Sequence, residues 1–191
     1  MVALTACEET PPPPLPSGQD VVDACIASGC TILDLDGMPL DDYAQLSALT
    51  QVEVMMASYT NFSDIGLLAP MTGLRELHVG DTDVTDLSGL SAFPGLRVLH
   101  VQNIEVSDYR PIRQLRALEE LAIGYADLPS LDFVRDLPAL RRLNLNAVEV
   151  PDLDSLRGHR GIQEIDLTGT YNLDLAPLLT LPNLRVVAID E

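Results

Sequence analysis

A repeat of 22 residues organises most of this sequence. Repeats begin, without a single insertion, at Cys30, Val52, Leu74, Leu96, Leu118, Leu140, Ile162 and Leu184. Within each repeat, apolar residues recur three and five positions after the first, as in Leu77 and Val79 after Leu74. Apolar residues at every second position indicate a short strand with one buried face. Positions are given below as offsets from the first residue of each repeat, which has offset 0.

A single unit of this length cannot bury its apolar side alone, so neighbouring units must stack. Each unit is expected to form a short strand and to return through a turn and a short helical or 3₁₀ segment. At about 4.8 Å per strand, eight strands give a parallel sheet roughly 35 Å long. We therefore predict an α/β solenoid over residues 30–191, with a concave sheet of about eight parallel strands and short 3₁₀ or helical segments on the convex side.

The pattern Leu-x-x-Leu-x-Leu resembles the leucine-rich-repeat family, specifically the 22-residue class found in bacterial internalins. The resemblance covers residues 30–191 and implies a horseshoe that serves recognition. The family usually has Asn at offset 8, where its side chain satisfies backbone groups. Here that position holds Met38, Thr60, Thr82, Ile104, Ala126, Val148 and Thr170. Backbone groups at this turn therefore need other partners.

Offset 12 is occupied by good helix-capping residues in every complete repeat. The residues are Asp42, Asp64, Asp86, Asp108, Ser130, Asp152 and Asp174. A short oxygen-bearing side chain before a helical segment accepts a hydrogen bond from its unpaired N–H groups. We interpret this column as caps of the returning segments; the alternative is an acidic ladder that binds cations.

The first 29 residues divide into three parts. Residues 1–7 contain Leu4-Thr5-Ala6-Cys7, which resembles the lipobox of bacterial lipoproteins, in which the Cys is lipidated. Residues 8–19 hold five prolines, as an extended tether would. Six residues before Cys7 are fewer than a signal peptide needs, so this interpretation expects a start further upstream. The alternative is a leader with an incidental thiol.

Residues 20–29 are predicted to form a cap helix, started by Asp20 and ended by Gly29. Cys25 and Cys30 flank the end of this helix. A disulfide between them fits an exported protein and requires a break at Gly29, because five positions of intact helix separate the two residues too far. The alternative is two buried thiols.

Side chains at offsets 2, 4 and 6 are expected to form the concave surface. His78 and His100 stand on adjacent strands there, near Glu76, Gln102 and Glu120. Two imidazoles with carboxylates could hold zinc or another divalent ion. We instead interpret them as a surface pair within a polar cluster, and expect no metal and no cofactor. The acidic surroundings are expected to raise the pKa of either histidine.

The two edges of the sheet carry opposite charge. After the strand, offset 9 reads Asp83, Glu105, Asp127 and Glu149 in successive repeats, and we call these residues the acidic rim. Before the strand, offset 1 includes Arg75, Arg97, Arg141 and Arg185. Stacked like charges are mildly unfavourable, so the acidic rim suits a basic peptide, a basic protein surface or Ca²⁺. A solvated rim is the alternative.

Arg142 and two tyrosines complete the candidate surface, and His159 lies outside it. Arg142 is the only base in the three concave columns. Tyr59 and Tyr125, at offset 7, serve either as contact residues or in local packing. His159 stands at offset 19, where other repeats have apolar residues, and is expected to perturb packing there.

The net charge of the chain restricts the classes of ligand that it can bind. The chain has 191 residues, 29 acidic side chains against 11 basic ones, and a net charge of −18. Such a chain repels phosphates, which argues against nucleic-acid binding. Motifs of a nucleophile elbow, a phosphate loop, a metalloprotease helix or paired CxxC ligands are not found.

We therefore predict a non-catalytic module, exported to the bacterial cell envelope and lipid-anchored through Cys7, that binds a protein or basic peptide. The alternative is a structural subunit that joins others through its uncapped C-terminal edge. The oligomeric state stays open.

Overall fold

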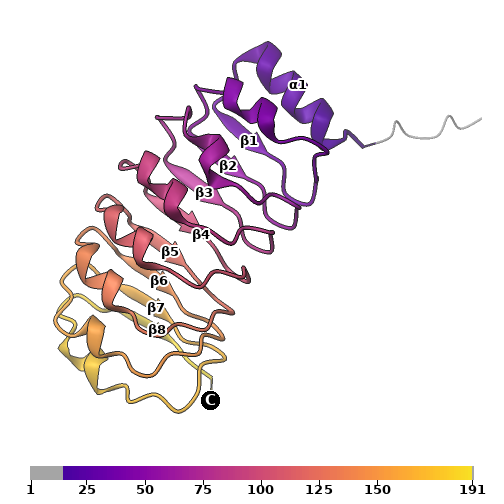
Figure 1. The fold of residues 1–191 in the computed structure, drawn as a ribbon. Helices are drawn as coiled ribbons and strands as arrows, with labels where there is room; N and C mark the ends of the chain where they lie inside the picture. Colours follow the sequence, from indigo (N-terminus) through magenta and orange to yellow (C-terminus); the bar gives the residue numbers. More distant parts are fainter. Residues whose placement is uncertain (1–14, 191) are drawn as a thin grey trace, which may run out of the picture.

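A computed structural model of the protein describes residues 15–190. Within this range the chain forms one sheet of eight parallel strands in the order β1 to β8 (Figure 1). The strands are β1 (Ile32–Asp34), β2 (Val54–Met56), β3 (Glu76–His78), β4 (Val98–His100), β5 (Glu120–Ala122), β6 (Arg142–Asn144), β7 (Glu164–Asp166) and β8 (Val186–Ala188). Each strand pairs with the next in the register of the repeat, so that Leu77 faces Leu99 and His78 faces His100. The predicted solenoid fold is confirmed.

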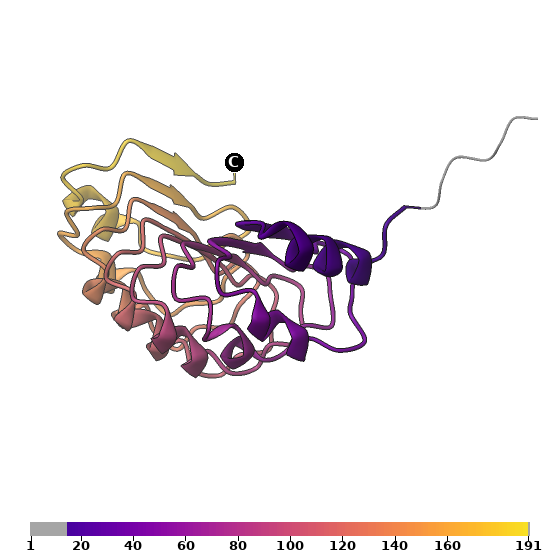
Figure 2. The same ribbon diagram turned by 90° about the horizontal axis from the view of Figure 1, so that it is seen from above.

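Short 3₁₀ segments carry the chain back between strands. They are η1 (Ala44–Ala48), η2 (Ile65–Leu68), η3 (Ser88–Ala92), η4 (Arg110–Gln114), η5 (Asp132–Asp136), η6 (Asp154–Leu156) and η7 (Ala176–Thr180). Figure 2 shows the strands along the inner side of the curved stack and the 3₁₀ segments along its outer side. No helix within residues 15–190 is both long and apolar enough to span a membrane.

The core lies between the sheet and the 3₁₀ segments. The central residue of each strand from β1 to β7 points inward and is buried, whereas all three residues of β8 are exposed. Tyr109 and Phe133 stack in this core with ring centroids 6.5 Å apart, and burial raises the pKa of the Tyr109 phenol. Repeated burial at the same offsets is what joins successive units into one cluster.

The N-terminal end of the stack is covered by helix α1 (Gly18–Ser28). The helix starts two residues earlier than predicted, and its N-cap is Ser17 rather than Asp20. Asp20 is instead the third helical residue, and its carboxylate accepts hydrogen bonds from the backbone N–H and the hydroxyl of Ser17, at 2.9 and 2.7 Å. Such a reciprocal capping box satisfies donors on both residues.

The helix ends at Gly29, whose φ of 68° lies in the left-handed region that glycine adopts without a steric penalty. This reversal brings the Cα atoms of Cys25 and Cys30 to 4.9 Å, and the two cysteines form a disulfide. The bridge joins the cap helix to the first repeat. Cys7 and residues 1–14 lie outside the described residues.

Every residue of the offset 12 column accepts a hydrogen bond from the backbone N–H two positions later. The six aspartates do so at 2.7 to 2.9 Å and Ser130 at 3.3 Å. Only Asp64 is the N-cap residue itself; in the other repeats the N-cap is the next residue. The side chains thus form Asx-type turns that satisfy an N–H in the first turn of each 3₁₀ segment: the second residue in η2 and the first residue in the others.

Threonine partly replaces the missing asparagine at offset 8. The Thr60 and Thr82 hydroxyls each donate to a carbonyl three residues earlier at 2.7 Å. Thr170 reaches the carbonyl of Leu145 in the preceding repeat at 2.8 Å. These bonds show which groups satisfy the turn in three repeats.

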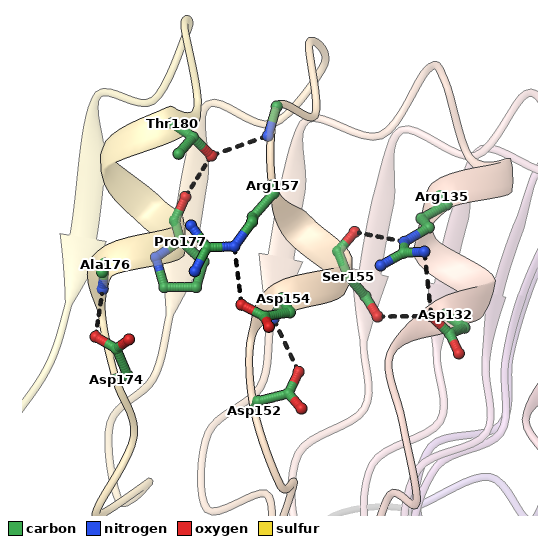
Figure 3. Close-up of polar contacts among 11 residues, drawn as sticks. Asp132, Arg135, Asp152, Asp154, Ser155, Arg157, Asp174, Ala176, Pro177 and Thr180 are labelled. Atoms are coloured by element: carbon green, nitrogen blue, oxygen red, sulfur yellow. Dashed lines mark hydrogen bonds and ion pairs between the residues drawn. The ribbon is translucent and has the colours of Figure 1, made fainter.

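Polar contacts also link the convex segments of the last repeats (Figure 3). The Ser155 hydroxyl donates to Asp132 at 2.9 Å, which connects η6 to η5. The backbone N–H of Gly158 donates to the Thr180 hydroxyl at 2.9 Å, which connects the turn after η6 to η7. Arg157 is held by Asp154 at 2.9 Å. Arg135 and Arg157 therefore each stand beside a carboxylate on the convex side.

His159 joins two repeats through both ring nitrogens. Its Nδ1 accepts from the backbone N–H groups of Gly161 and Ile162, at 3.2 and 3.3 Å. The other nitrogen, Nε2, therefore carries the proton and donates to the carbonyl of Leu137 at 3.1 Å. Burial lowers the pKa of His159, while its backbone contacts oppose that shift. The imidazole thus replaces an apolar residue and supplies hydrogen bonds, where the sequence predicted only disturbed packing.

Protonation of His159 should weaken the fold. Its pKa in the folded chain lies below the ordinary 6.5, so its contribution to stability is present above pH 6.5 and is lost as the pH falls below that value. We expect the Tm to fall between pH 7.5 and 5.5 and the fall to shrink in His159→Leu. The His100→Gln variant is measured in parallel, because the pKa of His100 is lowered too and its protonation contributes part of the same fall in Tm. An equal fall in wild type and His159→Leu would contradict the assignment.

Candidate functional site

The residue at offset 7 has a positive φ in every complete repeat. The positions are Gly37, Tyr59, Asp81, Asn103, Tyr125, Ala147 and Gly169, with φ between 50° and 75°. Glycine, asparagine and aspartate tolerate this left-handed region, whereas bulky side chains rarely adopt it. Tyr59 and Tyr125 are therefore strained, and their side chains are 69% and 62% exposed. Local packing does not account for these two tyrosines.

The two tyrosines border a hollow of about 590 Å³ on the concave face. We call this space the concave hollow. Its lining comes from repeats two to seven and consists of Ser58, Tyr59, Gly80, Asp81, His100, Gln102, Asn103, Tyr125, Asn144, Asn146 and Asp166. Apart from the tyrosines and Gly80, these are hydroxyl, amide, carboxyl and imidazole side chains. The hollow therefore offers both donors and acceptors to a ligand.

Two glycines at offset 6 make room for polar side chains of the next repeat. A Cβ at Gly80 would come within 3.3 Å of Gln102 Oε1, and one at Gly124 would collide with Oδ1 of Asn146. The amides therefore lie across the glycines of the preceding repeat.

The two carboxylates of the hollow are held by amides. Asn103 Nδ2 donates to Asp81, and Asn144 Nδ2 donates to Asp166 at 3.3 Å. Asp166 also accepts from the backbone N–H of Thr168 at 2.9 Å. Neither carboxylate has an Arg or His nitrogen within 4.0 Å among residues 15–190.

The predicted histidine pair lies at the edge of this hollow, and His100 is one of its lining residues. The rings of His78 and His100 are 4.1 Å apart between centroids. His78 Nε2 contacts Glu76 at 2.7 Å, and His100 Nε2 contacts Glu120 at 2.9 Å. Arg142 Nε donates to the second oxygen of Glu120 at 2.6 Å. One polar cluster thus runs from β3 to β6.

Burial lowers the pKa of His100, contrary to the prediction that acidic neighbours would raise it. The hydrogen bond to Glu120 opposes this effect, whereas the adjacent His78 adds to it. For Glu120, burial acts to raise the pKa, but the hydrogen bonds from His100 and Arg142 outweigh burial, and the pKa is lowered. Glu120 is therefore ionised and accepts hydrogen bonds from a neutral His100 and from Arg142.

No group of three or more His, Cys, Asp or Glu side chains in the described part of the chain has an arrangement that could hold a metal ion.

The acidic rim lies outside the hollow. All four side chains are exposed, and none has an Arg or His nitrogen within 4.0 Å in the part of the chain that the structure describes. Asp127 and Glu149 form a parallel bridge through their backbones, which places consecutive rim residues side by side. At the opposite edge, Arg97 and Arg141 lie 3.5 and 4.0 Å from the carboxylate of Glu119.

The structure divides the twelve predicted binding residues into three neighbouring sets. Tyr59, His100, Gln102 and Tyr125 line the hollow; Glu76, His78, Glu120 and Arg142 belong to the adjacent cluster with His100; and Asp83, Glu105, Asp127 and Glu149 form the rim. Sequence reasoning missed Asp81 and Asn103 as lining residues. The signal was present at offset 7, where Gly, Asn and Asp recur as expected for a left-handed turn.

Several solved structures of other proteins have the same fold as this chain. No family model and no curated protein matches the sequence. Among solved structures, the internalin InlF of Listeria monocytogenes is 23% identical with a TM-score of 0.79, over 90% of this chain and 51% of that one. The internalin InlC2 of the same organism is 22% identical with a TM-score of 0.73, over 81% and 69%. TLR13, solved in complex with ssRNA13, is 16% identical with a TM-score of 0.71, over 92% and 27%. This chain therefore shares the leucine-rich-repeat fold and spans about half the length of InlF.

Replacing a strained tyrosine by glycine should stabilise the protein. We expect Tyr59→Gly to raise the free energy of unfolding by up to about 1 kcal/mol, because glycine adopts a positive φ without a Cβ clash. Ser58→Gly, one residue earlier at a position without a positive φ, should instead lower it by about 0.5–1 kcal/mol. Urea denaturation of both variants measures the difference. Equal losses of stability would show that Tyr59 is not strained.

Proposed function

We propose that this chain is a non-catalytic interaction module that binds a protein or peptide on its concave face. The observation that carries the proposal is the pair of exposed tyrosines, Tyr59 and Tyr125, held in a strained conformation at the border of a polar hollow. Exposed tyrosines supply large contact areas at low entropic cost and are enriched at interfaces. The turn of every repeat imposes a positive φ at this offset, and a bulky residue kept at such a position is typical of a functional site.

The charge of this surface favours a basic partner. The four carboxylates of the acidic rim and the two of the hollow have no cationic partner among the described residues, and the net charge is −18. Opposite charge on a partner speeds encounter and selects the orientation of docking. The same field opposes a phosphate backbone, so the RNA held by TLR13 is not the ligand class proposed here.

The geometry does not favour catalysis. A general acid or base needs a group positioned against a reacting atom, usually in a pocket that excludes water. Here the carboxylates of the hollow are engaged by amides on an open face, and His100 is held between His78 and Glu120. These contacts suit a surface that holds its shape for recognition.

We further propose that the protein is exported to the bacterial cell envelope and anchored through a lipid on Cys7. The disulfide between Cys25 and Cys30 supports an oxidising compartment. The lipobox-like residues 4–7 and the proline-rich residues 8–19 fit an anchor and a tether. Mass spectrometry of the protein from its native host should find a diacylglyceryl group on Cys7, and an unmodified thiol there would refute the anchor.

A structural role is the second candidate. It would join this chain to a second copy through the C-terminal end of the stack. The observation that favours it is the exposure of apolar side chains there, with Leu179 at 90% and Ile189 at 53%. Exposed apolar residues in such a group are typical of a covered surface.

Affinity capture with matched variants separates the two proposals. The wild-type chain, a Tyr59→Asn/Tyr125→Asn variant and a Leu179→Ser/Ile189→Ser variant are immobilised and exposed to extracts of bacterial envelopes. Asparagine tolerates a positive φ, so the first variant should keep the fold. We expect the captured protein to be lost with the tyrosine variant and kept with the leucine variant. Its titration onto the purified chain then gives the Kd.

The opposite pattern would favour assembly. If the tyrosine variant retains the partner at full yield, the concave face is not the binding surface. If only the leucine variant loses it, and the lost protein is a second copy of this chain, the structural role replaces the binding role.

A further inference from the structure

The concave hollow combines aromatic surfaces with uncompensated negative charge. Tyr59 and Tyr125 present accessible rings at its border, and Asp81 and Asp166 contribute carboxylates to its lining. Both carboxylates are hydrogen-bonded to neutral amides, which orient the oxygens without cancelling their charge.

The basic side chains Arg142 and His100 of the concave face contact Glu120 and not the carboxylates of the hollow. Arg142 is bound to Glu120 by two of its nitrogens. His100 lines the hollow but donates to the same Glu120, and burial lowers its pKa, so it is neutral at pH 7. Arg142 balances Glu120 and His100 is uncharged, and no Arg or His nitrogen within the described residues lies within 4.0 Å of Asp81 or Asp166. The hollow is therefore negative overall.

An arginine or lysine side chain matches this combination. A cation is attracted to the face of a tyrosine ring and to carboxylates at the same time. The planar guanidinium can stack on a ring while it donates to a carboxylate, and the ammonium offers three donors as a compact charge. The amides of Gln102, Asn144 and Asn146 can donate to and accept from the peptide backbone on either side of this side chain.

We propose that the concave hollow is a binding site for an arginine or lysine side chain of the partner. The cation is placed between Tyr59 and Asp81, which stand at offset 7 of adjacent repeats, while Asp166 adds negative charge at the far end of the hollow. This inference rests on the proposed function, because it names the part of the partner that the concave face receives. An acidic segment or a nucleic acid would meet the same two carboxylates and the acidic rim, so neither fits the hollow.

The test uses short peptides as probes and the full chain as receptor. Acetyl-Gly-Gly-Arg-Gly-Gly-amide, its lysine counterpart and its citrulline counterpart are titrated at low salt and followed by amide chemical shifts in two-dimensional NMR. Citrulline keeps the shape of arginine and removes its charge. We expect saturable shifts at Tyr59, Asp81 and Asn103 with the arginine or lysine peptide and none with citrulline.

Charge-neutralising variants locate the cation. Asp81→Asn keeps the oxygen that accepts from Asn103. Asp166→Asn keeps one oxygen for the backbone N–H of Thr168 and gives up the longer bond from Asn144, so the fold should persist in both variants. We expect Asp81→Asn to raise the Kd of the arginine peptide by roughly three- to tenfold, as expected for a partly exposed ion pair. Asp166→Asn should raise it less, because Asp166 stands four repeats away from the cation. Asp41→Asn removes one exposed carboxylate outside the hollow and should leave the Kd almost unchanged. Higher salt should weaken binding in all of the chains.

Three results would overturn the inference. The citrulline peptide could bind as tightly as arginine, Asp81→Asn could bind as tightly as wild type, or the neutral oligosaccharide chitotetraose could saturate the hollow regardless of charge. The last result would assign the hollow to a glycan. If these probes fail while the Tyr59→Asn/Tyr125→Asn variant still loses the captured partner, the proposed function stands and only the cation site is wrong. Capture that is insensitive to both tyrosines would remove the proposed function itself.

Discussion

The rest of this structure depends on the backbone pairing of each repeat with the next at a constant register. A strand of three residues has too few hydrogen bonds and too little buried surface to persist alone. Stacking solves both problems, because every strand from β2 to β7 has a neighbour on each side and its central side chain enters a continuous core. A register shift by one residue would expose that column, so the apolar positions and the pairing specify each other.

This dependence explains why the sequence predicted the fold so closely. The repeat contains no insertion, and the same offsets are buried in successive units, so periodicity alone indicated strand number, direction and register. Finer features followed where the chemistry was local: the offset 12 aspartates accept backbone hydrogen bonds as expected, although most stand one residue before the formal cap. The start of α1 was misplaced because Ser17 and Asp20 are both suitable caps, and only the reciprocal hydrogen bonds distinguish their roles.

The candidate site was less accessible to sequence reasoning. Strand periodicity placed Glu76, His78, His100 and Glu120 on one face, but it could not show that His100 is buried enough for its pKa to fall. Nor could it show that Arg142 is engaged by Glu120, which depends on the rotamers of two long side chains on adjacent strands. Asp81 and Asn103 were missed because they follow the strand, where a turn of left-handed conformation directs them toward the concave face. His159 was misjudged because a polar residue in an apolar column can satisfy both of its nitrogens with backbone groups.

The left-handed turn at offset 7 also fixes the distance between Tyr59 and Tyr125. Three repeats separate them, and parallel strands lie about 4.8 Å apart, so the two side chains originate about 14 Å from each other along the stack. An extended peptide advances about 3.3 Å per residue, so roughly four residues span that interval. The solenoid thus sets a minimum length for any extended segment that contacts both rings.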